Sequence, residues 1–320
     1  MSNRTQRVVI DSILSSPLSV TSGVPQGTVL GPLLFLVYIN DLPDYIKHST
    51  IRLFADDCIL YRSIKCEHDA LLLQEDINSF YIWTRTWQME LNTDKCCSMN
   101  VTLNQLHKIS HSYYIHNAKL SVVNQCKYLG IIIQSDLKWN SHVNYVTAKA
   151  NQTLAMLKRN IKLAPQKIKE KAYKSLIRPQ LEFASSVWAP WQQFLINKIE
   201  QTQRRAARYV TSDYDPLSSV SLHISNLKWD TLEDRRNKSR LCIFYKMTHN
   251  QVAIPYHSYI QPSNYPHLRY SNTMKFLSMS CSKNSYKQSF FPNTIPQWNN
   301  LPTEVVASQS LITFKSYIGN

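Results

Sequence analysis

Short apolar runs separated by polar turns fill the first part of the chain and predict β-strands. Residues 8–10 and 18–20, in which only Ser19 is polar, predict two strands that are joined by a polar turn. Residues 51–61 predict a β-hairpin, because two apolar runs there flank only Asp56 and Asp57. The pattern therefore places two adjacent carboxylates at the tip of a tight bend.

Two helices are predicted around this hairpin. One runs through residues 32–39, because a proline is tolerated in the first turn of a helix. The other runs from residue 69 to residue 87, where apolar residues recur at helical spacing. Two later strands are expected, at residues 99–102 and along the β-branched run 127–133. The apolar face of the longer helix comprises Leu73, Ile77, Phe80, Thr84 and Trp87.

The second half of the chain changes to a helical pattern. Apolar residues between 143 and 161 keep helical spacing, and basic residues lie off that stripe. A second helix is predicted over residues 166–177, ending before Pro179 because a proline disfavours helical backbone in the residue before it. A third is predicted near residues 194–209. Residues 250–303 are rich in Pro, Ser, Asn and Tyr and predict loops.

Composition narrows the class of protein. The chain has 320 residues, of which 43% are hydrophobic and 11% aromatic, so it can bury a sizeable core. No apolar run reaches the roughly 18 residues that a membrane-spanning helix needs, so we expect no membrane partner. Seven cysteines without a C-x-x-C pair favour reduced thiols of an intracellular protein, nuclear or cytoplasmic, over a disulfide framework.

The net charge of +15 is unevenly distributed. Residues 1–139 hold 12 Lys+Arg and 12 Asp+Glu, whereas residues 140–320 hold 24 basic and 9 acidic residues. The whole positive excess therefore lies in the second part of the chain, which suggests a polyanionic partner, usually nucleic acid. From charge alone, a basic surface that only keeps the protein soluble is an equal alternative.

Two features carry candidate chemistry. Three of the five glycines, Gly23, Gly27 and Gly31, fall within nine residues and predict a shaped loop that can approach a ligand closely. Asp56 and Asp57 offer the oxygen ligands that Mg²⁺ prefers. Adjacent residues on an extended chain point to opposite faces, so we expect Asp56 to be the more direct metal ligand. Taken alone, an Asp-Asp pair is also common in ordinary turns without any metal.

The surroundings of the two aspartates resemble the palm of reverse transcriptases. The matching segments are Ser22–Gly27 (SGVPQG), Gly31–Phe35, Asn40–Pro43 and Phe54–Asp57 (FADD), and the pattern looks most like that of jockey-type non-LTR retrotransposons. Further matching segments, which extend the resemblance over nearly the whole chain, are Leu91–Asn92 with Lys95, Tyr128–Gly130, Ser175–Ile177, Val187–Pro190, Gln203–Ala206 and Trp298–Pro302.

The resemblance implies a fold, an activity and partners. It implies an α+β chain with a partial right-hand polymerase palm over residues 1–139, an antiparallel sheet with packed helices. A basic helical thumb over residues 140–212 and a C-terminal region of a retrotransposon polyprotein over residues 213–320 would follow. The implied activity is RNA-directed DNA synthesis by two-metal nucleotidyl transfer. Its partners would be an RNA template, a DNA primer and deoxynucleotides, and its cofactor Mg²⁺, with Mn²⁺ as an alternative.

The resemblance also implies roles for individual residues. Asp56 and Asp57 would hold the metal ions. Pro25, Gln26 and Gly27 would line the site against the template base and the incoming nucleotide, and Lys95 would lie near the phosphates of that nucleotide. Leu129 and Gly130 would belong to the turn that contacts the primer end. The basic residues expected to track the nucleic-acid backbone are Lys149, Lys158, Arg159 and Lys162.

One departure from the family pattern qualifies the expected activity. The palm of the family has another metal-binding aspartate on a strand some tens of residues before the SGVPQG segment. Only 21 residues precede Ser22 here, and Asp11 is the sole acidic residue among them. We therefore expect an N-terminally truncated chain that polymerises poorly or not at all by itself. Two alternatives stay open, a catalytically inactive nucleic-acid-binding relic and a fragment that does not fold.

Overall fold

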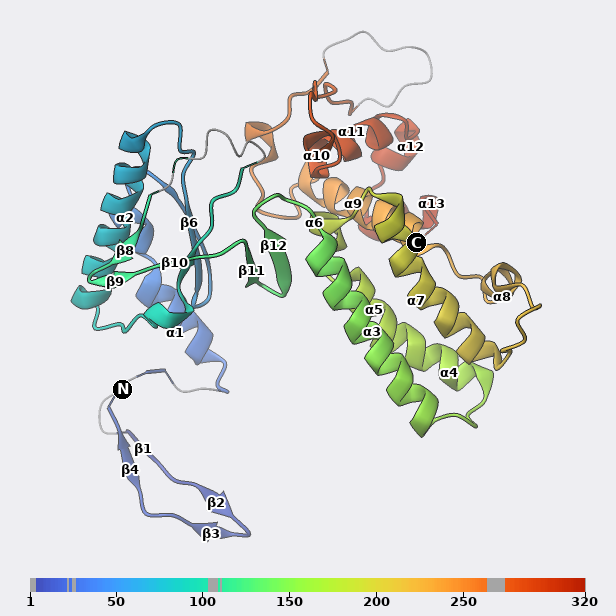
Figure 1. The fold of residues 1–320 in the computed structure, drawn as a ribbon, viewed down its shortest axis with the longest axis horizontal. Coiled ribbons are helices and arrows are strands. Elements are labelled where there is room, and N and C mark those ends of the chain that lie inside the picture. The colour runs from blue at the N-terminus through green and yellow to red at the C-terminus, as the bar shows by residue number, and fades with distance from the viewer. Residues whose placement is uncertain are drawn as a thin grey trace. The chain divides into compact units, whose positions relative to one another are not determined.

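The computed structural model combines many helices with several two-stranded sheets, so the expected α+β class is confirmed (Figure 1). The described residues are 4–21, 23–24, 27–102, 109, 111–263 and 274–319. They form two compact units, residues 1–123 and residues 124–320, and each unit is described by itself. Within the described ranges, no helix is long and apolar enough to span a bilayer.

The first unit begins with a two-stranded ribbon. Its bounds are β1 Arg4–Gln6, β2 Val9–Ile10, β3 Ile13–Leu14 and β4 Leu18–Val20. The predicted strands exist, but they do not pair with each other: β1 pairs with β4, and β2 pairs with β3. The reason is a tight turn at Asp11 and Ser12, whose φ angles of 48° and 68° are those of a type I′ turn. Residues 5–19 are all exposed.

Helix α1, Leu30–Ile39, follows the glycine-rich segment as predicted, with Pro32 in its first turn. The hydroxyl of Thr28 accepts a hydrogen bond from the backbone N–H of Gly31 at 3.1 Å, which satisfies one of the free donors at the helix start. A 3₁₀ turn, η1 Leu42–Tyr45, comes next.

The predicted hairpin is present, with its tip displaced by one residue. Strands β5 Thr50–Phe54 and β6 Asp57–Tyr61 pair antiparallel, and Phe54 lies opposite Asp57. The loop therefore consists of Ala55 and Asp56, and Asp57 is the first residue of β6. The expectation that both aspartates form the tip is wrong, because a two-residue loop leaves no room for the second.

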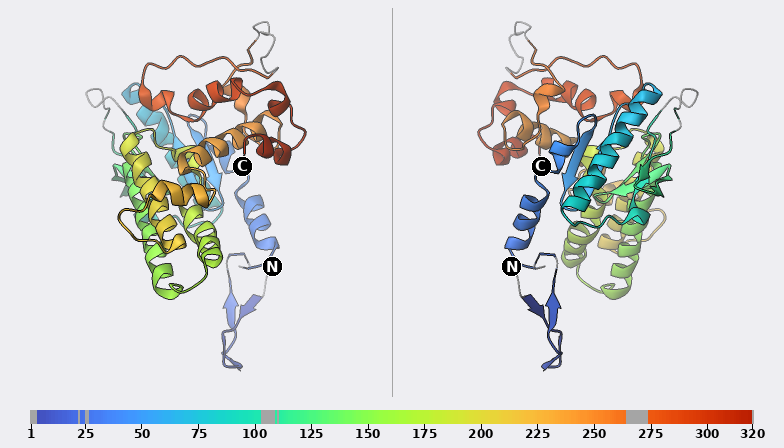
Figure 2. Two further views of the ribbon diagram at one scale, coloured as in Figure 1. Left: turned by 90° about the vertical axis from the view of Figure 1, so that its right-hand side faces the viewer. Right: turned by 90° about the vertical axis from the view of Figure 1, so that its left-hand side faces the viewer.

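Helix α2, Glu67–Thr86, confirms the predicted amphipathic helix and lies alongside the hairpin (Figures 1 and 2). Its most buried large side chain is Trp83, which packs with Ile39, Leu42 and partly buried residues of β5. Trp87, which was expected on the buried face, is 39% exposed. The buried face is therefore rotated toward Trp83.

Short elements complete the first unit. Their bounds are η2 Thr93–Lys95, β7 Cys97–Ser98, β8 Tyr114–Ile115, β9 Ala118–Lys119 and β10 Ser121–Val122. β7 pairs with β10 in parallel, and β8 with β9 antiparallel. The strand expected at residues 99–102 is wrong, because the pairing with β10 involves only residues 97 and 98.

The second unit opens with a hairpin where the sequence predicts one strand. Strands β11 Gln125–Tyr128 and β12 Ile131–Gln134 pair antiparallel and are joined by Leu129 and Gly130. The φ angles of these two residues, 45° and 85°, are both positive, as a type I′ turn requires. The glycine thus reverses the chain in the middle of the run that was predicted as one strand.

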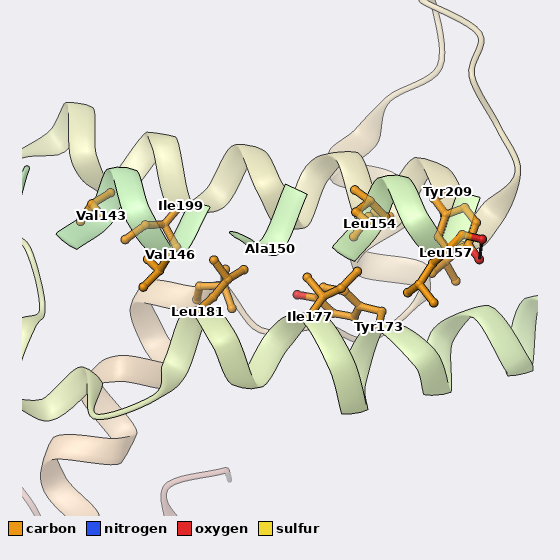
Figure 3. Packing of buried hydrophobic residues seen from close by; sticks show 14 of the residues in the cluster. Val143, Val146, Ala150, Leu154, Leu157, Tyr173, Ile177, Leu181, Ile199 and Tyr209 are labelled. Atoms are coloured by element: carbon orange, nitrogen blue, oxygen red, sulfur yellow. Dashed lines mark hydrogen bonds between the residues drawn. The ribbon is translucent and has the colours of Figure 1, made fainter. Parts of the chain in front are cut away.

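A helical bundle follows the hairpin and forms the core of the second unit. The buried stripe of α3, Asn140–Asn160, is as predicted and packs against the helices that follow. Figure 3 shows Val146, Leu154 and Leu157 of α3 pointing toward residues of those helices. The other bounds are α4 Gln166–Ala172, η3 Tyr173–Ile177, α5 Arg178–Glu182, α6 Ser185–Trp188 and α7 Gln193–Thr211.

The prediction that the second helix ends before Pro179 is wrong, because helical structure continues through α5. Residues 173–177 form a π-helical segment, in which the N–H of Arg178 donates to the carbonyl of Tyr173. This wider turn lets the chain accommodate a proline, whose ring would clash with the carbonyl one α-helical turn earlier.

A second hydrophobic cluster lies in the C-terminal part of this unit, around Phe244, Trp298 and Phe314. The bounds are α8 Val220–Asn226, α9 Leu232–Thr248, η4 Tyr256–Ser258, α10 Asn284–Lys287, α11 Phe290–Asn299, α12 Thr303–Val306 and α13 Leu311–Tyr317. The loop prediction for residues 250–303 is wrong over α11, which buries Ile295 and Trp298 although it contains Pro296.

Candidate active site and nucleic-acid interface

The β5–β6 hairpin carries two exposed carboxylates at its loop end. Asp56 is the second loop residue and Asp57 begins β6. Among the described residues, neither carboxylate has a hydrogen bond or an ion pair with the protein. Ala55, the first loop residue, has a φ of 50°, the positive value that the first position of a type II′ turn requires. The loop therefore presents two carboxylates that are free to take an external ligand.

Helix α2 holds the open end of this hairpin at both strands. The carboxylate of Asp76, which is 1% exposed, accepts hydrogen bonds from the backbone N–H groups of Lys47 at 2.9 Å and His48 at 3.0 Å, just before β5. After β6, Nη2 of Arg62 donates to Asp69 at 2.9 Å. The pKa of Asp69 is well below its ordinary value, because the backbone N–H of Lys65 and the guanidinium of Arg62 both stabilise the carboxylate. The hairpin is thus a fixed support for its loop.

Lys95 belongs to η2 and is exposed. Cys96, next to Lys95, contributes to the shifted pKa of the thiol of Cys58, next to Asp57, so the two thiols lie near each other. Desolvation, together with Cys96, raises the pKa of the Cys58 thiol to about 11. The structure therefore brings the Lys95 segment near the carboxylate hairpin.

The glycine-rich loop is described only in part. Pro25 and Gln26 lie outside the described residues. Gly27 is exposed and has a φ of 76°, which a residue with a side chain adopts only with strain. No atom lies within 4 Å of the position that a Cβ would occupy on Gly27, so neither Asp56 nor Asp57 packs against it there. The expected juxtaposition of this loop with the aspartates stays a prediction.

The chemistry of Asp56 and Asp57 suits a divalent cation. Carboxylate oxygens are the ligands that Mg²⁺ prefers, and Mg²⁺ keeps several waters, so two exposed acids can hold it together with solvent and substrate oxygens. Across the described residues, no group of three or more His, Cys, Asp or Glu side chains gathers into a metal cluster. Asp56 and Asp57 therefore fit as two ligands of such an ion.

In the second unit, Leu129 and Gly130 form the exposed loop of the β11–β12 hairpin. A Cβ on Gly130 would lie 3.1 Å from the ring of Phe183, so the glycine permits this close approach. The hairpin is attached to α3 at Ile132, whose N–H donates to Nδ1 of His142 at 3.2 Å. Whether this turn contacts a primer remains a prediction.

The predicted backbone-contacting residues differ in exposure. Lys149, Arg159 and Lys162 are exposed. Lys158 is half-buried, with its ammonium 5.5 Å from the centre of the Tyr214 ring. Burial and the nearby Arg205 both lower the pKa of Lys158. The first three are thus better placed for phosphate contacts than Lys158.

Two cations of α7, Lys198 and Arg205, lie beside α3, and the sequence analysis did not predict that they contact a nucleic-acid backbone. Lys198 donates to Asn144 at 2.5 Å and Arg205 to Asn151 at 3.3 Å. The two donors are seven residues apart in α7, and the two acceptors are seven residues apart in α3. The two helices therefore run parallel, side by side, as Figure 1 also shows. The same seven-residue spacing of the two basic residues and of the two asparagines is visible in the sequence and could have indicated this pairing.

Comparisons with known proteins agree with the motifs. A family model described as reverse transcriptase (RNA-dependent DNA polymerase) matches residues 3–133. The probable RNA-directed DNA polymerase from transposon X-element of Drosophila melanogaster is 31% identical over 249 residues, 74% of this chain and 27% of that protein. The RNA-directed DNA polymerase from mobile element jockey of Drosophila funebris is 28% identical over 217 residues, 64% of this chain and 23% of that protein.

A third relative, the probable RNA-directed DNA polymerase from transposon BS of Drosophila melanogaster, is 26% identical over 266 residues, 79% of this chain and 29% of that protein. The chain spans about a quarter of the length of these curated relatives. Together with the family match, these similarities identify residues 3–133 as reverse transcriptase sequence and relate the chain to the RNA-directed DNA polymerases of the X-element and jockey non-LTR retrotransposons.

Proposed function

We propose that this chain contributes the metal-binding hairpin of the palm to RNA-directed DNA synthesis. The observation that carries the proposal is the pair of exposed carboxylates, Asp56 and Asp57, which lack protein partners among the described residues and stand on a hairpin held by α2. The family match over residues 3–133 supports this assignment. When bound, divalent cations offset the charge that develops on the transferring phosphoryl group.

In this proposal, the residues of the chain position substrates. Asp56 and Asp57 hold the metal ions at the hairpin loop. Lys95 lies near the phosphates of the incoming deoxynucleotide, where its positive charge favours phosphate binding. Pro25, Gln26 and Gly27 line the template base and nucleotide, and Leu129 and Gly130 contact the primer end.

We further propose the domain assignment that the family implies. Residues 1–139 correspond to part of a right-hand palm, residues 140–212 to a basic helical thumb, and residues 213–320 to a C-terminal region of the retrotransposon polyprotein. The parallel helices α3 and α7, with exposed Lys149 and Arg159 on the former, support a thumb that follows the nucleic-acid backbone.

Metal binding by the full chain tests the proposal independently of catalysis. Electron paramagnetic resonance should show Mn²⁺ binding that Asp56→Asn or Asp57→Asn weakens by at least about tenfold. Asp11→Asn is the matched control, because Asp11 is also an exposed aspartate in a two-residue hairpin loop. Equal Mn²⁺ affinity in all three variants and the parent chain would refute the assignment.

A primer-extension assay with Mg²⁺ or Mn²⁺ addresses the activity itself. Synthesis that depends on Asp56 would show that the chain is catalytically sufficient. Metal binding without synthesis would agree with the expectation that the chain polymerises poorly by itself.

A second candidate function is nucleic-acid binding without catalysis, which the net charge of +15 over residues 140–320 favours. On a duplex, each phosphate contact adds about −0.9 to the slope of log affinity against log salt. Neutralising Lys149, Arg159 or Lys162 should therefore reduce the slope by about 0.9 per residue. Binding with no dependence on salt would exclude this role for the three residues.

A further inference from the structure

Two arginines of α9 are buried without the partners that buried cations need. Arg236 is 2% exposed and Arg240 is 6% exposed. Both Nη atoms of Arg236 and Nε of Arg240 have no hydrogen-bond partner among the described residues. The neighbouring Arg235 differs, because its Nη2 donates to Glu182 at 3.1 Å. Buried polar atoms without partners are rare in proteins and often mark the place of an ion or a ligand.

Both arginines line one pocket of about 330 Å³ in the second unit. Its walls come from α9, from the segment after α6 that contains Trp191, from the start of α7 and from α11. Because Arg236 and Arg240 are four residues apart, their side chains leave the same face of α9 one turn apart. Two guanidiniums thus line one small cavity.

Neighbouring amide oxygens bond with donors other than Arg236. Oδ1 of Asn237 accepts from Nη2 of Arg240 at 2.5 Å. On the α11 side, Oδ1 of Asn293 accepts from Gln297, and Oε1 of Gln288 accepts from Asn293, both at 2.9 Å. The two oxygens on the α11 side therefore bond with neighbouring amide groups, the Asn237 oxygen bonds with Arg240, and none of the three bonds with Arg236.

The nearest acids do not neutralise the arginines. Glu233 lines the pocket, and Glu200, Glu233 and Glu182 all act to raise the pKa of Arg236. Burial outweighs them and lowers the pKa of Arg236, and burial together with Arg236 lowers the pKa of Arg240. Within the described part of the chain, neither guanidinium forms an ion pair with a carboxylate. The pocket therefore holds two buried guanidinium groups without a direct ion pair, which costs stability unless an anion is present.

We propose that this pocket binds a phosphate group, held by the unpaired N–H groups of Arg236 and Arg240. A tetrahedral phosphate presents oxygens in several directions and can therefore accept from both guanidinium groups at once. A planar carboxylate has only two oxygens and matches a single guanidinium better. The phosphate can be free or part of a nucleic-acid backbone. The site is in the second unit and does not depend on metal binding by Asp56 and Asp57.

Thermal unfolding of the full chain with added inorganic phosphate, at ionic strength held constant with chloride, tests the proposal. Phosphate should raise the melting temperature of the parent chain, since a ligand that binds only the folded state stabilises it. Arg236→Gln and Arg240→Gln should each weaken phosphate binding by about ten- to a hundredfold. Without phosphate, Arg236→Gln should melt no lower than the parent chain, because a buried charge without a direct ion pair has been removed.

Arg235→Gln is the matched control. It should lower the melting temperature, because it breaks the bond with Glu182, yet keep the full response to phosphate. An unchanged phosphate response in both Arg236→Gln and Arg240→Gln would overturn the proposal. So would a response to acetate as large as that to phosphate, which would indicate a carboxylate site.

Short single-stranded RNA distinguishes the two sources of phosphate. RNA binding that competes with inorganic phosphate, and that Arg236→Gln weakens, would assign the pocket to a nucleic-acid backbone. Phosphate binding that RNA does not displace would assign it to a free phosphate or phosphate monoester. A parent chain that responds to neither inorganic phosphate nor RNA would refute the phosphate site.

Discussion

The backbone N–H of Ile132 donates a hydrogen bond to Nδ1 of His142 at 3.2 Å, and this bond joins the β11–β12 hairpin to α3. His142 is 1% exposed, and its ring lies edge-on against Trp188 with 4.6 Å between ring centres. Burial lowers the pKa of His142 to about 4. The bond requires an unprotonated Nδ1, so the hairpin is held by an acceptor that acid removes.

We predict that the stability of the second unit falls as the pH decreases from 6.5 to 4. In this range the unfolded state, with an ordinary histidine pKa of 6.5, binds a proton that folded His142 with a pKa of about 4 does not. The unfolded state is therefore favoured as the pH falls, with a total loss of up to about 3 kcal/mol. Chemical denaturation at a series of pH values measures the effect.

His142→Asn is the control for this prediction, because an amide oxygen can replace the Nδ1 acceptor without titrating. The difference in unfolding free energy between the parent chain and His142→Asn should shrink as the pH falls from 6.5 to 4. A difference that is the same at both pH values would mean that His142 does not titrate as predicted.

Leu129→Asn should stabilise the β11–β12 hairpin by up to about 1 kcal/mol, because asparagine tolerates positive φ and Asn-Gly is the preferred pair of a type I′ turn. Leu129 has a φ of 45° and is 37% exposed, so little apolar burial is lost. Hydrogen exchange of the amides of β11 and β12 measures the change.

Gly130→Ala is the opposing variant in the same turn. It should destabilise the hairpin by about 1 kcal/mol, because alanine is strained at the positive φ of 85° and its Cβ would crowd the Phe183 ring.

If Leu129→Asn slowed primer extension while protecting the hairpin amides, the side chain of Leu129, rather than the turn shape, would be implicated in primer contact. Equal effects of both substitutions on amide protection would contradict the turn assignment.

Ala55→Gly should stabilise the β5–β6 hairpin by up to about 1 kcal/mol, since it removes the cost of a positive φ from an alanine and retains both aspartates. The same change at Ala307, an exposed alanine with a φ of −85°, should instead lower stability. Thermal melting compares the two variants, and a loss of stability in both would mean that Ala55 is not strained.

The elements that depend on neighbouring residues could be predicted from the sequence, and those that depend on distant contacts could not. The β5–β6 hairpin and the buried stripe of α3 depend on patterns within a few residues, and both are confirmed. The turn at Gly130 was missed, although a glycine inside a predicted strand is a local signal for a break in that strand. The helical path through Pro179 depends on a π-helical segment that no residue pattern indicates.

The burial of Arg236 and Arg240 could not be predicted from the sequence, because it depends on tertiary contacts. Arg236 and Arg240 follow Leu232 at intervals of four residues, so they share the face of α9 that this buried leucine occupies. A pattern of charges on a helix ordinarily indicates a solvated face, whereas α9 packs against α6, α7 and α11 in the folded chain. The catalytic and binding roles of the site residues remain predictions, because their substrates come from outside the chain.

Asp76 provides the clearest test of how the carboxylate hairpin is supported. Its two oxygens accept from the N–H groups of Lys47 and His48, so Asp76→Ala should cost about 2–4 kcal/mol by leaving two donors unpaired. Asp76→Asn keeps one acceptor and should cost about half as much. Glu75→Ala is the matched control, because Glu75 also contacts His48, at 3.7 Å, but its side chain is 63% exposed. An exposed pair of this kind contributes less than about 1 kcal/mol. Denaturant unfolding compares the three variants, and a loss in Asp76→Ala no larger than that in Glu75→Ala would show that α2 does not hold the hairpin through this residue.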